Sequence, residues 1–189
     1  MNGPRWLIVL GLLLGSFVIM GSAQVLTSYR LQKSPPNSSE PAVNEGLISE
    51  CKSNTHIPES VRLWCEPIVE HASQHQMDPI LVAAVIEVES GGAADALSHS
   101  GAVGLMQVMP RDGLASQFQC INGPCFASRP SMAELVDPVF NIQYGSSYLS
   151  GLLNRYSGDS REALNAYGPR DMNYRYADLV LAVYQSYNQ

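Results

Sequence analysis

Two glutamates, Glu87 and Glu89, stand near the end of an apolar stretch and are the residues best placed for acid–base chemistry. The stretch begins like a helix, because the Asp78 side chain can cap free backbone N–H groups and Pro79 has no N–H to leave unbonded. A run rich in Val, Ile, Leu and Ala follows, and a pair of glycines then ends it. The sequence therefore predicts a helix over residues 80–90.

Helical geometry separates the two glutamates. Residues three, four and seven positions apart share a helix face, and that spacing leads back from Glu89 to an isoleucine and two valines. Glu87 shares its face with smaller side chains. Glu89 also lies in the last turn, where the helix dipole disfavours a carboxylate. Burial and dipole both raise its pKa, as a general acid requires, so Glu89 is the predicted catalytic acid. The alternative is that both glutamates are solvated surface residues.

The residues that follow favour the catalytic interpretation. Glu89-Ser90 is followed by Gly-Ala-Val-Gly-Leu-Met-Gln-Val-Met-Pro at residues 101–110. In this order and spacing the two segments resemble the lytic transglycosylases of the soluble (SLT) type, relatives of goose-type lysozyme. The resemblance covers about residues 66–184 and implies a mainly α-helical, lysozyme-like fold with a cleft between lobes. It also implies that Glu89 is the catalytic acid and that the glycine-rich segment lines the sugar-binding cleft.

The resemblance also indicates which residues bind substrate. The expected substrate-binding residues are Ser90, Ser98, Gly104, Leu105, Met106, Gln107, Tyr148 and Tyr167. Glycine allows a backbone to approach a ligand closely, and the amide of Gln107 can pair with both a hydroxyl and an acetamido group. Tyr148 lies in a segment, residues 137–149, that resembles the family signature Asp-Pro-x-x-Asn-Ile-x-x-Gly-x-x-Tyr-Leu. We expect its ring in the core and its hydroxyl at the cleft.

The chain departs from the family pattern after Tyr167. Where the family commonly has Ala-Tyr-Asn-Ala-Gly-Pro, residues 166–169 read Ala-Tyr-Gly-Pro, so a contact made by that asparagine has no counterpart. The final helix, predicted over residues 174–187, resumes the resemblance. Its stripe of Tyr176, Val180 and further tyrosines is predicted to be core rather than a platform for sugars.

The resemblance implies a reaction: cleavage of the β-1,4 bond between N-acetylmuramic acid and N-acetylglucosamine in peptidoglycan. Glu89 would protonate the glycosidic oxygen, and the muramic 6-hydroxyl would attack its own anomeric carbon to give a 1,6-anhydro sugar. Ordinary glycosidases use two carboxylates; here the N-acetyl group of the substrate is implied to replace the second. Two alternatives stay open: a goose-type muramidase using Asp95, and a non-catalytic wall-binding factor of a secretion, conjugation or phage apparatus.

Composition limits the partners. The chain of 189 residues is 46% hydrophobic, which supports a buried core, and its net charge of −6 gives no basic surface for nucleic acid. Peptidoglycan glycan strands are the expected partner, and their binding must come from a shaped cleft because the acidic chain gains no general attraction to an anionic wall. No cofactor and no metal are expected.

Residues 1–26 are predicted to be a signal peptide or an N-terminal membrane anchor. Arg5 precedes residues 6–20, which carry no charge, and small residues permit cleavage after Ala23. The uncharged stretch also extends to Tyr29, long enough for a spanning helix, so both interpretations stay open. Either one directs the folded part to the cell envelope outside the cytoplasm. A membrane-spanning secretion or conjugation complex is a further candidate partner.

The rest of the chain divides into a predicted flexible linker over residues 27–50, which is rich in Pro and Ser, and a catalytic domain over residues 51–189. The four cysteines suit an oxidising compartment. Pairing Cys51 with Cys65 and Cys120 with Cys125 closes the shortest loops and is favoured among the three possible pairings. Zinc is the rival interpretation, but no set of histidines stands beside these cysteines.

Overall fold

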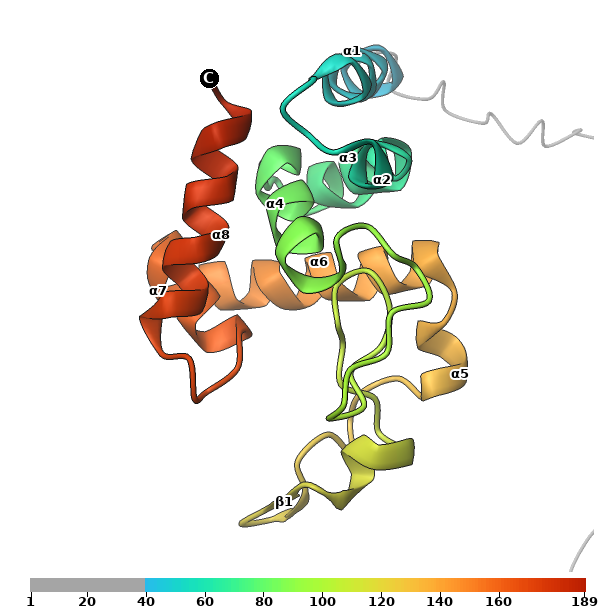
Figure 1. Cartoon of the computed structure of the whole chain (residues 1–189), viewed down its shortest axis with the longest axis vertical. Coiled ribbons are helices and arrows are strands. Elements are labelled where there is room, and N and C mark those ends of the chain that lie inside the picture. The colour runs from blue at the N-terminus through green and yellow to red at the C-terminus, as the bar shows by residue number, and fades with distance from the viewer. Residues whose placement is uncertain (1–39) are drawn as a thin grey trace, which may run out of the picture. The chain divides into compact units, whose positions relative to one another are not determined.

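The structure, a computed structural model, describes residues 40–189, and helices dominate that part of the chain (Figure 1). Its α-helices are α1 (Glu40–Ser53), α2 (Glu59–Arg62), α3 (Cys65–Gln74), α4 (Pro79–Ser90), α5 (Met132–Leu135), α6 (Pro138–Arg155), α7 (Ser160–Tyr167) and α8 (Tyr174–Tyr187). Between α4 and α5 lie a short 3-10 helix, η1 (Gly113–Gln117), and the antiparallel strands β1 (Gln119–Cys120) and β2 (Gly123–Pro124). The predicted mainly α-helical class is confirmed. The predicted signal peptide or anchor lies outside the described residues.

Helix α4 is the central helix of this arrangement. Asp78 caps its start by accepting a hydrogen bond from the N–H of Ile80 at 2.9 Å, and Gly91 ends it with a left-handed φ of 62°. Residues 81–86 are all buried, because α4 contacts α2, α3 and α8. A helix that is apolar on every side belongs in a core. The predicted helix with its two glutamates is therefore the element around which the others pack.

Helix α6 is the longest helix of residues 40–189 and runs between α5 and α7 (Figure 1). It contacts α3, α5 and α7, and α7 packs in turn on α8. Its buried face includes Ile142, Leu149 and Leu152. At Gly145 the face is flat, since a Cβ there would lie only 2.4 Å from the sulfur of Met106. The α6 backbone therefore lies directly against the glycine-rich segment that follows α4.

The structure differs from the predicted linker at its C-terminal part, because residues 40–50 belong to helix α1. Helix α1 packs on α3, with Leu47 and Ile48 partly buried against the core. A disulfide joins Cys51 to Cys65, at a Cα–Cα distance of 5.7 Å. The Pro/Ser content that suggested a linker says nothing about this packing, which depends on a cysteine and on apolar residues later in the chain. No helix in residues 40–189 is long and apolar enough to span a bilayer.

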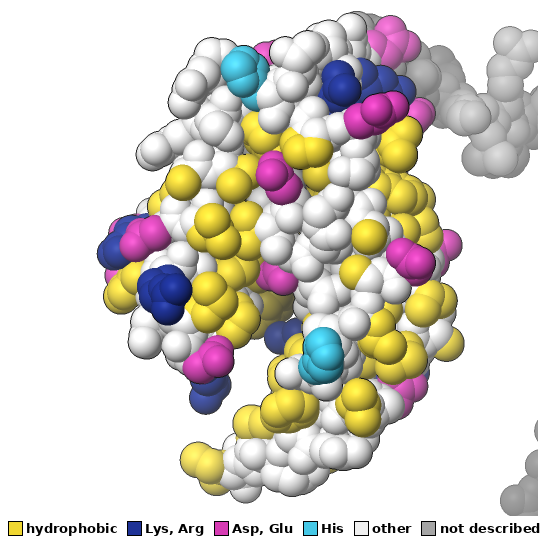
Figure 2. All heavy atoms as spheres, in the orientation of Figure 1, with side chains coloured by type: hydrophobic (Ala, Val, Ile, Leu, Met, Phe, Trp, Pro, Cys, Tyr) yellow, Lys and Arg dark blue, Asp and Glu magenta, His cyan; other side chains and the backbone are white. Residues whose placement is uncertain are grey.

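Residues 111–131, which we call the hairpin lobe, leave the helices between α4 and α5 and return (Figure 1). The disulfide between Cys120 and Cys125 closes the hairpin at a Cα–Cα distance of 5.0 Å. Both disulfides of the shortest-loop pairing are thus present. In the space-filling view a hollow lies between the hairpin lobe and the side formed by α7 and α8 (Figure 2).

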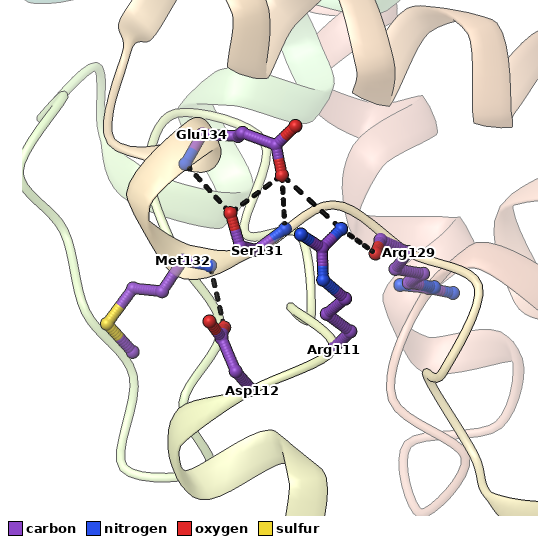
Figure 3. A network of polar contacts seen from close by, with 6 residues as sticks. All are labelled: Arg111, Asp112, Arg129, Ser131, Met132 and Glu134. Carbon is purple, nitrogen blue, oxygen red and sulfur yellow. Dashed lines mark hydrogen bonds and ion pairs between the residues drawn. The ribbon is translucent and has the colours of Figure 1, made fainter.

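A polar network fastens the base of the hairpin lobe (Figure 3). The carboxylate of Asp112 accepts a hydrogen bond from the backbone N–H of Met132 at 2.7 Å. Ser131 and Glu134 form a reciprocal capping box at the start of α5, and Arg111 lies 3.4 Å from the same Glu134 carboxylate. The two ends of the lobe are therefore held together where they join the helical body.

Candidate active site

Glu89 occupies the last turn of α4, and its carboxyl group is half-buried. The hydroxyl of Tyr176, on α8, donates a hydrogen bond of 2.6 Å to its Oε1. Burial raises the pKa of Glu89 to about 7, although the hydrogen bond from Tyr176 acts in the opposite direction. Near neutral pH a large fraction of Glu89 therefore keeps its proton, which is what a general acid needs.

Glu87 shows that burial alone does not select the acid. Its pKa is also raised by burial, and its Oε2 has no hydrogen-bond partner among residues 40–189. What distinguishes Glu89 is a donor from another helix that fixes one carboxyl oxygen. A general acid must hold its proton in a defined direction, so the contact with Tyr176 favours Glu89.

Three tyrosines, which we call the tyrosine row, extend from this contact: Tyr176, Tyr167 and Tyr148. The rings of Tyr176 and Tyr167 are stacked with centroids 6.4 Å apart, and those of Tyr167 and Tyr148 are 5.6 Å apart. Burial, followed by the charge of Glu89, raises the pKa values of Tyr167 and Tyr176 well above the usual value, so both stay hydrogen-bond donors. Tyr167 donates to the carbonyl of Met106 at 2.9 Å.

Tyr176 is a functional candidate that the sequence interpretation missed. Its ring is in the core as predicted, only 3% exposed, yet its hydroxyl reaches Glu89. A buried tyrosine needs a hydrogen-bond partner for its hydroxyl. That requirement is the one indication of a polar contact at Tyr176 that the sequence offers. The shortened connection after Tyr167 lies against the same ring, since a Cβ on Gly168 would come within 2.3 Å of it.

Asn141, on α6, is a second residue without a predicted role. It is completely buried, and its Oδ1 accepts a hydrogen bond of 2.8 Å from the N–H of Met106. Its Nδ2 donates to the carbonyls of Val103 at 2.8 Å and Leu135 at 3.0 Å. Gly104 has a φ of +76°, and a Cβ there would lie 2.4 Å from Nδ2 of Asn141. One amide thus fixes the glycine-rich segment.

The predicted substrate-binding residues of this segment divide into two groups. Leu105 and Met106 are fully buried, so the prediction that they contact sugar is corrected: the N–H and carbonyl of Met106 are both hydrogen-bonded within the protein. The hydroxyl of Ser90 donates to the carbonyl of Leu105 at 2.8 Å. Ser90 therefore joins α4 to the segment.

Ser98 lies just before the glycine-rich segment and Gln107 lies within it, and both are partly exposed. The hydroxyl of Ser98 accepts from the N–H of Ala102 at 2.8 Å. The amide nitrogen of Gln107 donates to the carbonyls of Gly104 at 2.9 Å and Ala96 at 3.2 Å. The sequence predicts that the amide of Gln107 pairs with both a hydroxyl and an acetamido group of the substrate. In the structure its nitrogen donates within the protein, so only its carbonyl oxygen is left for a ligand.

The acidic residues considered as a second carboxylate have other positions. Asp112 and Asp137 cap backbone N–H groups, those of Met132 and Phe140. Asp95 is exposed in the turn after α4 and makes no side-chain hydrogen bond or ion pair within residues 40–189. That described part also contains no group of three or more His, Cys, Asp or Glu side chains suited to a metal ion.

A surface pocket of about 350 Å³ lies at the opposite end of α4, where Asp78, Leu81 and Tyr184 line it. None of the predicted site residues borders this pocket. The candidate active site is therefore the region of Glu89, the glycine-rich segment and the tyrosine row.

Comparison with known proteins shows the family of this chain. Residues 66–178 match the family model described as the transglycosylase SLT domain. The chain is 36% identical over 100 residues to membrane-bound lytic murein transglycosylase E of Buchnera aphidicola, covering 53% of this chain and 44% of that protein. It is 37% identical over 102 residues to endo-type membrane-bound lytic murein transglycosylase A of Klebsiella pneumoniae, covering 53% and 49%. The chain thus spans about half the length of these relatives.

A phage protein and a solved structure extend the comparison. The transglycosylase of Enterobacteria phage PRD1 is 36% identical over 104 residues, covering 55% of this chain and 34% of that protein. The crystal structure of an inactive mutant of the lytic transglycosylase Slt from Pseudomonas aeruginosa matches with a TM-score of 0.51 and 24% identity, covering 65% of this chain and 23% of that one. This likeness shows a shared fold. By the match that contains Glu89, the glycine-rich segment and the tyrosine row, this chain belongs to the transglycosylase SLT domain family.

Proposed function

We propose that this protein is a peptidoglycan lytic transglycosylase in which Glu89 is the only acid–base residue. The observation that carries the proposal is the half-buried carboxyl group of Glu89, with a pKa of about 7 and one oxygen held by Tyr176. The family membership and the names of the relatives support the choice of murein as substrate.

In the first step, Glu89 gives its proton to the glycosidic oxygen between N-acetylmuramic acid and N-acetylglucosamine while the bond to the anomeric carbon breaks. Because Tyr176 donates to Oε1, we assign the acidic proton to Oε2. As that proton leaves, negative charge develops on the carboxyl group. A hydrogen bond to a charged acceptor is stronger than one to a neutral acceptor, so Tyr176 stabilises the group as it ionises.

In the second step, the Glu89 carboxylate takes a proton from the muramic 6-hydroxyl, whose oxygen bonds to the anomeric carbon. The product is a 1,6-anhydro sugar, Glu89 is again protonated, and no water is consumed. The N-acetyl group of the substrate stabilises the positive charge in between. This assignment agrees with Asp112 and Asp137 being engaged in capping, so that neither is free as the second carboxylate of an ordinary glycosidase.

We infer a location in the cell envelope, because the relatives are named as membrane-bound and murein is found there. The choice between a cleaved signal peptide and a retained anchor stays a prediction. That this enzyme serves a membrane-spanning secretion or conjugation complex also stays a prediction. In such a complex, a small wall-cleaving domain would open the wall locally.

The test is mass spectrometry of fragments released from purified peptidoglycan by the full chain, with Glu89→Gln beside it and Glu87→Gln as the matched control. We expect 1,6-anhydro fragments from the wild type and Glu87→Gln, and none from Glu89→Gln. Fragments with reducing ends would indicate a muramidase and direct attention to Asp95. Wall binding without fragments from any variant would indicate a non-catalytic assembly factor.

A further inference from the structure

Arg129 stands at the end of the hairpin lobe, between two aromatic rings. The centre of its guanidinium group is 4.6 Å from the ring centroid of Tyr148 and 4.9 Å from that of Phe126. A cation at these distances over a ring is attracted by the negative ring face. The side chain is half-buried, so the two rings fix the plane and direction of the guanidinium group.

This position puts Arg129 at one end of the tyrosine row and Glu89 at the other. Tyr148 contacts Arg129, and Tyr176 contacts Glu89. Both charges act on the hydroxyl of Tyr167 between them: Glu89 raises its pKa and Arg129 lowers it. Since Arg129 belongs to the hairpin lobe and Tyr176 to α8, Arg129 and the tyrosine row together connect these two parts of the fold.

The hydrogen-bonding edge of this guanidinium group has no protein acceptor within residues 40–189. Arg111, in the same lobe, instead lies 3.4 Å from the carboxylate of Glu134. Figure 3 shows the side chain of Arg129 pointing away from Glu134. A half-buried guanidinium group normally pairs with an acceptor, and its planar fork suits a carboxylate.

The backbone of Arg129 is held in place. Its carbonyl accepts a hydrogen bond of 3.3 Å from Nη1 of Arg111, and its N–H donates to the carbonyl of Phe126 at 2.9 Å. A group fixed in this way is prepared for a ligand before binding, which reduces the entropy lost when the ligand binds.

We propose that Arg129 binds a carboxylate of the glycan substrate and so selects strands that contain muramic acid. Of the two sugars in murein, only muramic acid carries a carboxyl-bearing substituent, its lactyl ether. That carboxyl is either free or amide-linked to a stem peptide, which carries carboxylates of its own. The inference rests on murein being the substrate, as proposed above. In a chain with a net charge of −6, Arg129 supplies the positive charge locally.

The test measures binding by calorimetry in the Glu89→Gln background, with and without Arg129→Gln. The ligands are a murein tetrasaccharide with its stem peptides, the same sugar after the peptides are removed, and chitotetraose, which has no carboxyl group. We expect Arg129→Gln to raise Kd roughly 10-fold to 100-fold for a carboxylate-bearing ligand, from the loss of a charge-assisted hydrogen bond, and less than about 3-fold for chitotetraose.

Each pattern of Kd changes over the three ligands leads to a different conclusion. A loss confined to the peptide-bearing sugar assigns the carboxylate to the stem peptide, and a loss confined to the peptide-free sugar assigns it to the lactyl group. Losses on both mean that Arg129 accepts either carboxylate. Equal losses on all three ligands, or none on any, would overturn the proposal, because Arg129 would then only support the hairpin lobe.

Two controls complete the design. Arg155→Gln removes an exposed arginine in the last turn of α6 and should leave all three Kd values unchanged. Arg129→Lys keeps the charge without the planar fork, and we expect a smaller loss of affinity with the same preference for carboxylate ligands. If the thermal unfolding curve shows that Arg129→Gln does not fold, Arg129→Lys decides the question. Because binding is measured without turnover, a wild type that releases no anhydro fragments would refute the reaction and leave this selectivity measurable.

Discussion

At the scale of single residues, the pKa of Glu89 depends on the position of the Tyr176 hydroxyl that donates a hydrogen bond to it. The proposed reaction begins with Glu89 protonated, so kcat/KM should decrease as the pH rises through about 7. The hydrogen bond from Tyr176 stabilises the charged carboxylate and thereby lowers this pKa. The two residues together set the alkaline limit of activity.

Tyr176→Phe tests this link. Without the hydroxyl the pKa of Glu89 rises, so the alkaline decrease of kcat/KM should move to higher pH. The maximal rate should also fall, by roughly 10-fold to 100-fold, because the ionising carboxyl loses a hydrogen bond to a charged group. A pH–rate profile from pH 5 to 9 measures both effects. An unshifted alkaline limb would show that Tyr176 has no influence on the acid; Tyr187→Phe, another buried tyrosine of α8, is the control.

At the scale of elements, the glycine-rich segment is held by α6 rather than by its own turns. Asn141 makes its hydrogen bonds to that segment and to the end of α5 from a completely buried position. Unpaired buried polar groups are costly. The position of the glycine-rich segment therefore depends on a buried residue of another helix.

Asn141→Ala should reduce the free energy of unfolding by roughly 3 kcal/mol, since it leaves buried backbone groups without partners. Chemical denaturation measures the change, and the exposed Asn154→Ala on the same helix should change stability by less than about 0.5 kcal/mol. A loss below about 1 kcal/mol for Asn141→Ala would mean that water replaces the amide and that the segment holds itself.

Whether a feature of the fold or the site can be predicted from the sequence depends on how far apart along the chain the residues that determine it lie. The cap at Asp78 and the glycine end of α4 depend on neighbours within a few residues, and the sequence is sufficient for them. The contact between Tyr176 and Glu89 spans 87 positions and that between Asn141 and Met106 spans 35, so neither can be derived from local pattern.

The same reason explains the corrected assignments. Leu105 and Met106 stand in a segment expected to face sugar, but the approach of α6 at Gly145 buries the Met106 side chain. Residues 40–50 follow a Pro/Ser-rich stretch and are helical because α3 gives them a surface to pack on. In both cases a tertiary contact outweighed the local composition.

At the scale of the whole molecule, the raised pKa of Glu89 makes folding depend on pH. A carboxyl group whose pKa is higher in the folded than in the unfolded state contributes stability that is fully present below the unfolded value of 4.5 and is lost as the pH rises through about 7. Wild type should therefore lose up to about 3 kcal/mol of stability over this interval, by 1.36 kcal/mol per pKa unit.

Glu89→Gln removes the titrating group, so its stability should change less between pH 4.5 and 8 and exceed that of the wild type above pH 7. Urea denaturation at a series of pH values measures the difference. Parallel curves for the two proteins would mean that Glu89 ionises without cost, which would contradict burial as the cause of its raised pKa.

The disulfide between α1 and α3 has a mechanical consequence. Tension applied to the chain before Glu40 enters the domain through α1, and the bond between Cys51 and Cys65 passes it directly to α3. Residues 52–64, including helix α2 that touches α4, are bypassed and carry little of the load. An enzyme held at its N-terminal side while it works on a stiff polymer would thus be pulled through the disulfide and α3, and the segment between the two cysteines would not have to bear the tension.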